Sequence, residues 1–289
     1  MKIILSRKGF DSANGGMPSP IFPDGRIISL PIPTTRSPTT INDLINNKYN
    51  LSDVISDLSK KKLHSNQHVH VDPDVDFNVL ANRPKDWRGA FGQVGAAQSH
   101  LSNNKVGKGD LFVYFGWFRE VEQHNKVWQF KQKAPDLHVI YGWLLVEEVI
   151  NIYRNDENIL IEHPWLKYHP HLCGTNYKQN TIYVGSKTLP PEVNKTESGY
   201  GVFSKISNIQ TLTDKSQCNR SIWKLPASFY PGEGKPALTY HGKKERWTSN
   251  NESVILKSVG RGQEFVLDIG FYPDTYEWLI NLFTQPLNN

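Results

Sequence analysis

Short apolar runs alternate with turns in the first thirty residues of the chain. The aliphatic run at residues 2–6 predicts a buried strand, and a charged turn follows it at residues 6–12. Glycine, proline and serine dominate residues 15–26, a composition typical of tight turns. Residues 27–30 predict a second short strand. We therefore expect turned β structure here, with a core strand that delivers a charged loop.

A helical spacing replaces this pattern between residues 40 and 63. Apolar residues recur there three and four positions apart, at Ile41, Leu44, Ile45, Leu51, Val54, Ile55 and Leu58. This spacing predicts a short pair of helices, the second with Ser52 as its N-cap. A weaker helical period follows at residues 92–101, and Asp274 is expected to cap a helix near the C-terminus.

The strongest strand signals lie in the middle of the chain. Residues 111–118 and 138–146 are aromatic and aliphatic runs, and each is preceded by turn-forming residues. Each run contains one glycine, Gly116 or Gly142, and a glycine inside a strand marks a bulge or a close approach of another backbone. We expect these runs to be neighbouring strands of a β-barrel.

The organisation of the whole chain follows from these elements. There is no internal repeat and no long linker, so we expect one α+β unit over residues 1–289. Its core is predicted to be a mixed β-barrel around residues 87–153, elaborated by N- and C-terminal β segments and short helices.

Composition narrows the class of protein. A formal net charge of +5 favours a polyanionic partner such as nucleic acid. Cys173 and Cys218 are the only cysteines and form no CxxC pattern, which is typical of reduced thiols. The apolar run at the N-terminus is too short for a signal peptide, and no run could span a membrane. We expect a cytoplasmic protein with no membrane partner and make no prediction of its oligomeric state.

The charged turn after the first strand is one candidate site. Lys8 could attack a sugar or carbonyl carbon, and Asp11 could activate water or stabilise a developing positive charge. The favoured alternative is that Lys8 binds phosphate while Asp11 caps its own turn. Gly15 and Gly16 would permit close approach of a phosphate or sugar to the backbone.

Aromatic and basic residues form a second candidate site, for a nucleobase. Tyr114, Trp117 and Trp143 could stack on bases, and each stack contributes about 1–3 kcal/mol. For any one of these rings alone, core packing is the favoured interpretation. The full set predicted to bind nucleic acid or a base is Ser6, Arg7, Gly15, Gly16, Ser19, Arg88, Tyr114, Trp117, Arg119 and Trp143.

Histidines and carboxylates suggest two places where a cation could bind. In an extended chain, His68, His70 and Asp72 would point to one face and could hold a divalent ion. A polar strand edge with a turn at Asp72 is the favoured interpretation. The three histidines within residues 163–171 are expected to be ordinary hydrogen-bonded loop residues. We therefore predict no metal and no cofactor.

The central segment resembles a known superfamily. A Gly-Asp turn at residues 106–110 leads into an aromatic strand, and residues 138–142 open a later strand with an Ile-x-Gly pattern. This order is similar to the PUA-like superfamily and its EVE and ASCH branches, over roughly residues 87–153. The resemblance implies a barrel pocket that holds a flipped or modified base against aromatic walls. It defines no catalytic residue.

The chain as a whole resembles the nucleotide modification associated domain 3 family. The segments that carry this resemblance are residues 6–12, 15–20, 70–74, 109–118 and 240–242, Arg246 with Trp247, and residues 261–266. The family is found in phages and bacteria and is linked by gene context to DNA base modification. The resemblance therefore implies a setting of modified DNA or nucleotides, and no particular reaction.

Two functions fit these observations. In the first, the protein recognises a modified or flipped nucleobase, in DNA modification or phage–host conflict, with modified DNA as its partner. In the second, it is an enzyme that modifies or excises a nucleobase by glycosylase-like or base-transferase chemistry, using Lys8 and Asp11. A Walker loop, a GxGxxG after a strand, a GxSxG and a zinc-deaminase pattern are all missing from the sequence. Nucleoside triphosphate hydrolysis and nicotinamide redox chemistry are therefore not expected.

Overall fold

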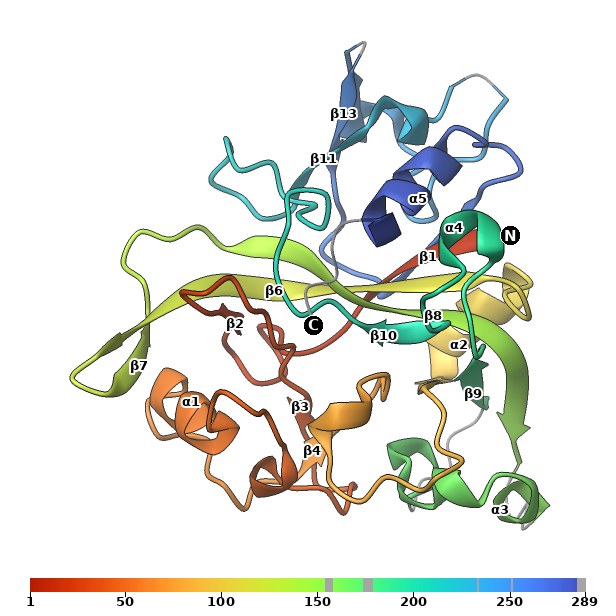
Figure 1. Cartoon of the computed structure of the whole chain (residues 1–289). Coiled ribbons are helices and arrows are strands. Elements are labelled where there is room, and N and C mark those ends of the chain that lie inside the picture. Colours follow the sequence, from red (N-terminus) through yellow and green to blue (C-terminus); the bar gives the residue numbers. More distant parts are fainter. Residues whose placement is uncertain (154–157, 174–178, 233, 251, 285–289) are drawn as a thin grey trace.

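A curved sheet crosses the middle of the molecule, with N-terminal segments on one face and C-terminal segments on the other (Figure 1). This computed structural model describes residues 1–153, 158–173, 179–232, 234–250 and 252–284. The fold is mixed α+β with few helices, as predicted, and the sheet curls into a half-barrel. Within the described ranges, no helix has the length and apolar character needed to cross a membrane.

The main sheet is built around two long central strands. Its path runs in the order β14 (Glu264–Asp268), β1 (Lys2–Arg7), β6 (Leu111–His124), β8 (Leu137–Ile152), β9 (Asn180–Gly185) and β5 (Ala90–Val94). Three further strands join it, β2 (Ser19–Ile21) and β7 (Val127–Phe130) on β6 and β10 (Tyr200–Val202) on β8. β1 is parallel to β6 and antiparallel to β14. The predicted strand at residues 2–6 is thus confirmed as a central, buried strand.

The antiparallel pairing of β6 with β8 confirms the two adjacent strands predicted for the central region. The register shifts between Tyr114 and Phe115, which marks a bulge. A Cβ added to Gly116 would lie 2.8 Å from the backbone oxygen of Lys8, and one added to Gly142 would lie 2.8 Å from that of Gly201. Both glycines therefore mark close backbone approaches, as their position inside strands predicted.

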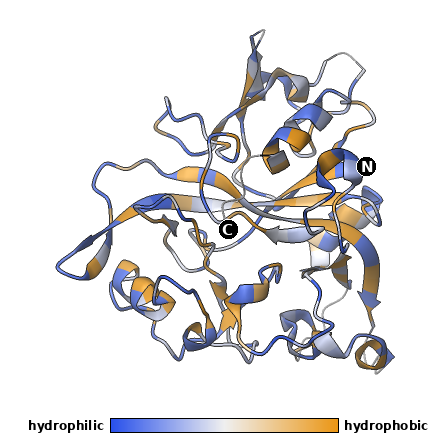
Figure 2. Ribbon diagram, in the orientation of Figure 1, coloured by the Kyte–Doolittle hydropathy of each residue, from blue (hydrophilic) through white to orange (hydrophobic). Residues whose placement is uncertain are grey.

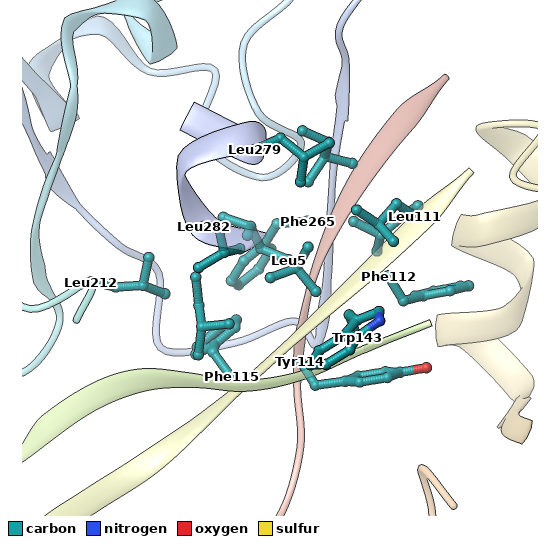
Figure 3. Packing of buried hydrophobic residues seen from close by; sticks show 14 of the residues in the cluster. Leu5, Leu111, Phe112, Tyr114, Phe115, Trp143, Leu212, Phe265, Leu279 and Leu282 are labelled. Carbon is teal, nitrogen blue, oxygen red and sulfur yellow. The ribbon is translucent and has the colours of Figure 1, made fainter. Parts of the chain in front are cut away.

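The curl of the sheet encloses an aromatic interior, and its outer face packs on the C-terminal segments. Inside the curl, the ring of Phe91 lies 5.0 Å from that of Phe112 and 5.5 Å from that of Tyr114. Figure 3 shows Leu279 and Leu282 packed near Leu5 and Phe265 in the core cluster. Apolar residues are concentrated along the central strands, whereas loops and the β7 hairpin are more hydrophilic (Figure 2). Burial of these side chains supplies the main driving force for the fold.

The N-terminal segments cover one face of the sheet with their own small core. Their elements are β3 (Ile32–Pro33), η1 (Ile41–Asp43), α1 (Leu51–Leu58), β4 (Val69–His70) and η2 (Phe77–Val79). α1 buries Leu51, Val54, Ile55 and Leu58, which confirms the helical spacing of the second predicted group.

Three predictions for this N-terminal layer are wrong. The first helix of the predicted pair is only the 3₁₀ turn η1, because Leu44 is extended and bridges to Leu80 instead of continuing a helix. The N-cap of α1 is Asn50, whose side chain accepts hydrogen bonds from the backbone NH groups of Ser52 and Asp53. Residues 27–30 form no strand, since only an isolated bridge joins Ile27 to β2.

The C-terminal segments form a second layer on the opposite face. A small antiparallel sheet consists of β11 (Ile222–Pro226), β13 (Ser253–Lys257) and β12 (Trp247–Ser249), with η5 (Ala227–Phe229) and η6 (Lys244–Arg246) beside it. α5 (Thr275–Thr284) confirms the helix predicted after Asp274. The remaining helices are α2 (Gly95–Asn103), α3 (Asn158–Glu162), η3 (Pro164–Tyr168), η4 (Pro170–Leu172) and α4 (Pro191–Asn194).

Candidate functional site

The two ends of the curled sheet are joined by side chains. Gln93 Nε2 on β5 donates a hydrogen bond to Glu264 Oε1 on β14 at 2.6 Å. Lys8 Nζ, just beyond β1, lies 2.6 Å from the same oxygen. The side chain of Lys8 is 10% exposed and that of Glu264 is 1% exposed, so this is a buried ion pair. We call Lys8, Gln93 and Glu264 the seam cluster.

Polar atoms near the seam cluster point into the curl without partners. Ser6 is paired in register with both Tyr114 and Glu264, which places these three side chains on the inner face. Ser6 Oγ, the Tyr114 hydroxyl and Glu264 Oε2 are buried and have no hydrogen-bond partner within the described part of the chain. Burial, together with the nearby carboxylates of Asp72 and Glu264, raises the pKa of Tyr114 well above its ordinary value. Its phenol therefore stays neutral and can donate a hydrogen bond.

A second polar cluster gathers around Asp72. His70 Nε2 and His171 Nε2 lie 3.7 Å and 3.5 Å from Asp72 Oδ2. His169 Nε2 lies 3.6 Å from the other carboxylate oxygen, Oδ1. The side chain of Asp72 is only 5% exposed. We call His70, Asp72, His169 and His171 the histidine–aspartate cluster.

The free edge of β5 positions Asp72. Asp74 and Ala90 exchange two backbone hydrogen bonds of 2.8 Å and 2.9 Å, which extends the sheet by one bridge. Asp72 is thereby brought to Gly92, whose backbone NH donates to Asp72 Oδ1 at 2.7 Å. The ring of His171 packs against the same glycine, and a Cβ there would lie 2.3 Å from it. Any larger residue at this position would displace His171.

Charge is shared unevenly within the histidine–aspartate cluster. Burial alone would raise the pKa of Asp72, but its contacts with His171 and His70 hold that pKa well below its ordinary value. Burial opposes protonation of His171, yet the Asp72 carboxylate raises its pKa. Burial lowers the pKa of His169 to about 3, so that ring is neutral. His171 and Asp72 thus form a pair between which a proton can be held or moved.

Asp72 also lines a pocket between the N-terminal layer and the sheet. The cavity has a volume of about 470 Å³. Its polar lining residues are Arg26, Ser29, Asn46, Asn47, Lys48, Asp72, Asp76, Asn78, Tyr141 and Ser204. At its rim, Arg26 and Lys48 both pair with Asp24, at 3.2 Å and 2.5 Å. The pocket is large enough for a small organic ligand, and Asp72 connects it to the histidine–aspartate cluster.

The structure gives different roles to the two residues predicted as catalytic in the N-terminal turn. Lys8 points into the seam cluster, whereas Asp11 Oδ1 accepts hydrogen bonds from the backbone NH groups of Ala13 and Asn14. Asp11 therefore caps its own turn, the alternative that the sequence favoured. Gly15 and Gly16 both have positive φ and complete this turn.

Four other residues predicted to bind nucleic acid or a base make contacts within the protein. Arg7 donates to the carbonyls of Val259 and Gly260, each at 2.8 Å, and Arg88 donates to that of Gly185. Arg119 lies 3.9 Å from Asp136. Ser19 Oγ is buried and accepts a hydrogen bond from the backbone NH of Leu30. These residues hold loops and strands in place, and a role in binding nucleic acid stays a prediction.

The three aromatic residues predicted to stack on a base do not share a surface. Tyr114 is fully buried inside the curl, where its ring lies 5.5 Å from that of Phe91. Trp143 is 3% exposed, and its ring lies 5.1 Å from that of Phe283 in α5. Trp117 is partly exposed, with the Arg220 guanidinium 4.1 Å from its ring centre. In this structure, Tyr114 and Trp143 are core residues.

The candidate cation ligands are partly those that the sequence indicated. His70 and Asp72 lie in the histidine–aspartate cluster, whereas His68 is exposed and outside it. His171 is the partner that sequence reasoning missed. The three histidines within residues 163–171 were the available signal, but nothing in the sequence pairs that segment with residues 70–72.

Comparison with known proteins identifies a family and no close relative. The family model described as nucleotide modification associated domain 3 matches residues 2–268, nearly the whole chain. No curated protein and no solved structure matches the chain. The predicted likeness to PUA-like domains is therefore not confirmed. The family match agrees with the resemblance seen in the sequence, and the chain belongs to the nucleotide modification associated domain 3 family.

Proposed function

We propose that this protein binds a nucleobase or nucleotide in the pocket beside Asp72 and acts on it as an enzyme. One observation carries the proposal: a pocket of about 470 Å³ includes in its wall a buried carboxylate that contacts histidines. Membership of the nucleotide modification associated domain 3 family supports a setting of nucleotide modification. We further propose that modified DNA in the cytoplasm is the source of the bound base.

The lining of the pocket suits a nucleobase. Asn46, Asn47 and Asn78 offer amide groups, which can both donate to and accept from the edges of a base. Tyr141 and Phe203 supply aromatic surface. At the rim, Arg26 and Lys48 bear two positive charges against the single carboxylate of Asp24, so a phosphate could pair with either.

The chemistry of the pocket wall favours an enzyme over a reader. Recognition of a base needs stacking and hydrogen bonds, and it does not require a buried carboxylate coupled to titratable histidines. Perturbed pKa values of groups in a cleft are typical of catalytic sites, and Asp72, which lines the pocket, has one, as do its neighbours His169 and His171. Held by its histidine contacts, Asp72 could orient a water molecule or a polar group of the bound base at the pocket wall.

The pocket can be tested by filling it. Asn47 is exposed and lines the pocket, so Asn47→Trp should occupy the cavity without disturbing the core. We expect binding of the preferred ligand to weaken at least about tenfold. The measurement is a binding panel of mononucleotides and duplexes that carry unmodified and hypermodified bases. Asn66→Trp is the matched control, because Asn66 is exposed and outside the pocket lining, and it should bind as the wild type does.

Mass spectrometry of the same ligands after incubation separates the two functions. A change in base mass, reduced about 10²- to 10⁴-fold by Asp72→Asn with binding retained, supports an enzyme. Retention of the ligand without a mass change would identify a reader and overturn the proposed chemistry. Unchanged binding by Asn47→Trp would show that this pocket is not the site.

A further inference from the structure

Three groups of the histidine–aspartate cluster come from two separate parts of the chain. His70 ends β4, Asp72 follows it, and His171 lies in η4, about a hundred positions later. One side-chain atom from each lies within 4.8 Å of the other two. The two distances to Asp72 Oδ2 are 3.7 Å and 3.5 Å. Two ligands bound at about 2.1 Å to one tetrahedral ion are about 3.4 Å apart, so both distances to Asp72 are close to those of a metal site, and the two imidazoles, within 4.8 Å of each other, would need at most a modest approach.

We infer that His70 Nε2, Asp72 Oδ2 and His171 Nε2 bind a divalent transition-metal ion such as Zn²⁺ or Fe²⁺. Two imidazoles and one carboxylate suit such ions, whereas Ca²⁺ and Mg²⁺ prefer sites made of oxygen ligands. Three protein ligands leave at least one coordination position for water or substrate. Asp72 also lines the pocket, so a ligand bound there would lie beside one of the three metal ligands.

The surroundings hold the three groups in a ligating orientation. His171 Nδ1 lies 2.8 Å from Asn180 Oδ1, and a proton on Nδ1 would leave the lone pair of Nε2 facing Asp72. The backbone NH of Gly92 donates to Asp72 Oδ1, so Oδ2 is the oxygen left for a metal. Such outer hydrogen bonds accompany most metal-bound histidines and carboxylates in proteins.

His169 has a supporting place in the cluster. Its Nδ1 accepts a hydrogen bond from the backbone NH of His171 at 3.3 Å, so the proton of the neutral ring is on Nε2. That Nε2 is buried, faces Asp72 Oδ1 at 3.6 Å, and has no hydrogen bond within the described residues. A small movement of Asp72 onto an ion could complete this contact. His169 is therefore a positioning residue and not one of the three ligands.

The inference is tested by metal binding without any nucleotide. The full chain is treated with a chelator, desalted and titrated with Zn²⁺ by calorimetry and with Co²⁺ by visible absorption. We expect one ion per chain, the absorption bands of low-symmetry Co²⁺, and no displacement by millimolar Mg²⁺ or Ca²⁺. His70→Ala should weaken binding at least about tenfold, and Asn180→Ala about 10- to 100-fold through the orientation of His171.

His68→Ala provides the matched control, since His68 lies two positions before His70, is exposed, and is outside the cluster. It should leave metal binding unchanged. Circular dichroism establishes that each variant is folded. Failure of the wild type to bind Zn²⁺ or Co²⁺, preference for Mg²⁺, or equal losses in His68→Ala and His70→Ala would each overturn the inference.

The part played by the ion in the reaction rests on the proposed function, but its binding does not. Metal binding by a chain that binds no nucleobase would leave the site established and reject the proposed function. If the chain binds a nucleobase and changes it but binds neither Zn²⁺ nor Co²⁺, the proposed function is supported and the metal site is rejected. The two failures are therefore distinguishable.

Discussion

Replacing Lys8 with methionine is expected to lower the free energy of unfolding by about 3–5 kcal/mol. Methionine keeps most of the aliphatic stem but removes the ammonium group that lies 2.6 Å from Glu264 Oε1. Glu264 is 1% exposed, so its carboxylate would stay buried with the neutral amide of Gln93 as its hydrogen-bond donor. Urea denaturation at pH 7, followed by circular dichroism, measures the loss.

Two further variants show whether burial is the cause. Lys8→Met combined with Glu264→Gln should recover much of the stability, because no charge is then left uncompensated. Lys108→Met removes a pair with Glu147 of similar length, 2.7 Å, whose side chains are 72% and 42% exposed. That change should cost less than about 1 kcal/mol. Equal losses in the Lys8 and Lys108 variants would contradict the importance of burial at the seam.

The central strands could be predicted because their signal is local. Residues 111–118 and 138–146 are continuous apolar runs after turns, and both lie in long strands. Their full lengths could not be predicted, since β6 continues to His124 and β8 to Ile152 through mixed polar sequence. Those extensions are fixed by pairing with β7 and β9, which is a tertiary property.

The candidate site could be predicted only in fragments. Lys8 stood out because it follows a core strand, but its partner Glu264 is 256 positions away. His70 and Asp72 were candidates because they alternate along the chain with His68, whereas His171 was interpreted as an ordinary loop histidine. Their convergence depends on the edge of β5 and on the space left by Gly92, and no local spacing encodes either.

The aromatic residues show why residue type alone does not place a side chain on a binding surface. Large aromatic side chains bury the most apolar area, so those in the strongest strands belong first to the core. Tyr114 and Trp143 fulfil that role here. The pocket beside Asp72 is lined largely by polar residues of the N-terminal layer, among them Asn46 and Asn47 in the segment predicted as a helix pair and Asp72 in the predicted polar strand edge.

The free energy of unfolding is expected to fall as the pH drops below about 6.5, because buried histidines stay neutral in the folded protein. Burial, with smaller contributions from Arg246 and Arg7, lowers the pKa of His241 to about 4, although its hydrogen bond with the Thr239 carbonyl acts in the opposite direction. Burial, with Arg7 and Arg220, also places the pKa of His138 well below its ordinary value. Both rings accept hydrogen bonds that protonation would break, from Trp223 Nε1 to His138 Nδ1 and from the Val259 NH to His241 Nε2.

The sign of this pH dependence follows from the numbers of protons bound by the folded and the unfolded states. Above pH 7 both histidines are neutral whether the chain is folded or unfolded, so they add no pH dependence. Below about pH 6.5 the unfolded chain takes up protons that the folded protein excludes, and each histidine removes up to about 1.4 kcal/mol per pH unit. For His241 this loss continues until the pH approaches its folded pKa of about 4.

Denaturation in urea at several pH values between 7 and 4.5 tests this, with stability compared between variants at each pH. His241→Gln removes one titrating group. As the pH is lowered, the free energy of unfolding of this variant should therefore fall less steeply than that of the wild type, by up to about 1.4 kcal/mol per pH unit. Between pH 7 and 4.5, the free energies of unfolding of the wild type and of His241→Gln should therefore approach each other by about 2–3 kcal/mol. His64→Gln is the control, because His64 is exposed and should leave the slope unchanged. Parallel curves for the wild type and His241→Gln would mean that His241 accepts its proton in the folded state, and that its hydrogen bond from Val259 does not hold the ring neutral.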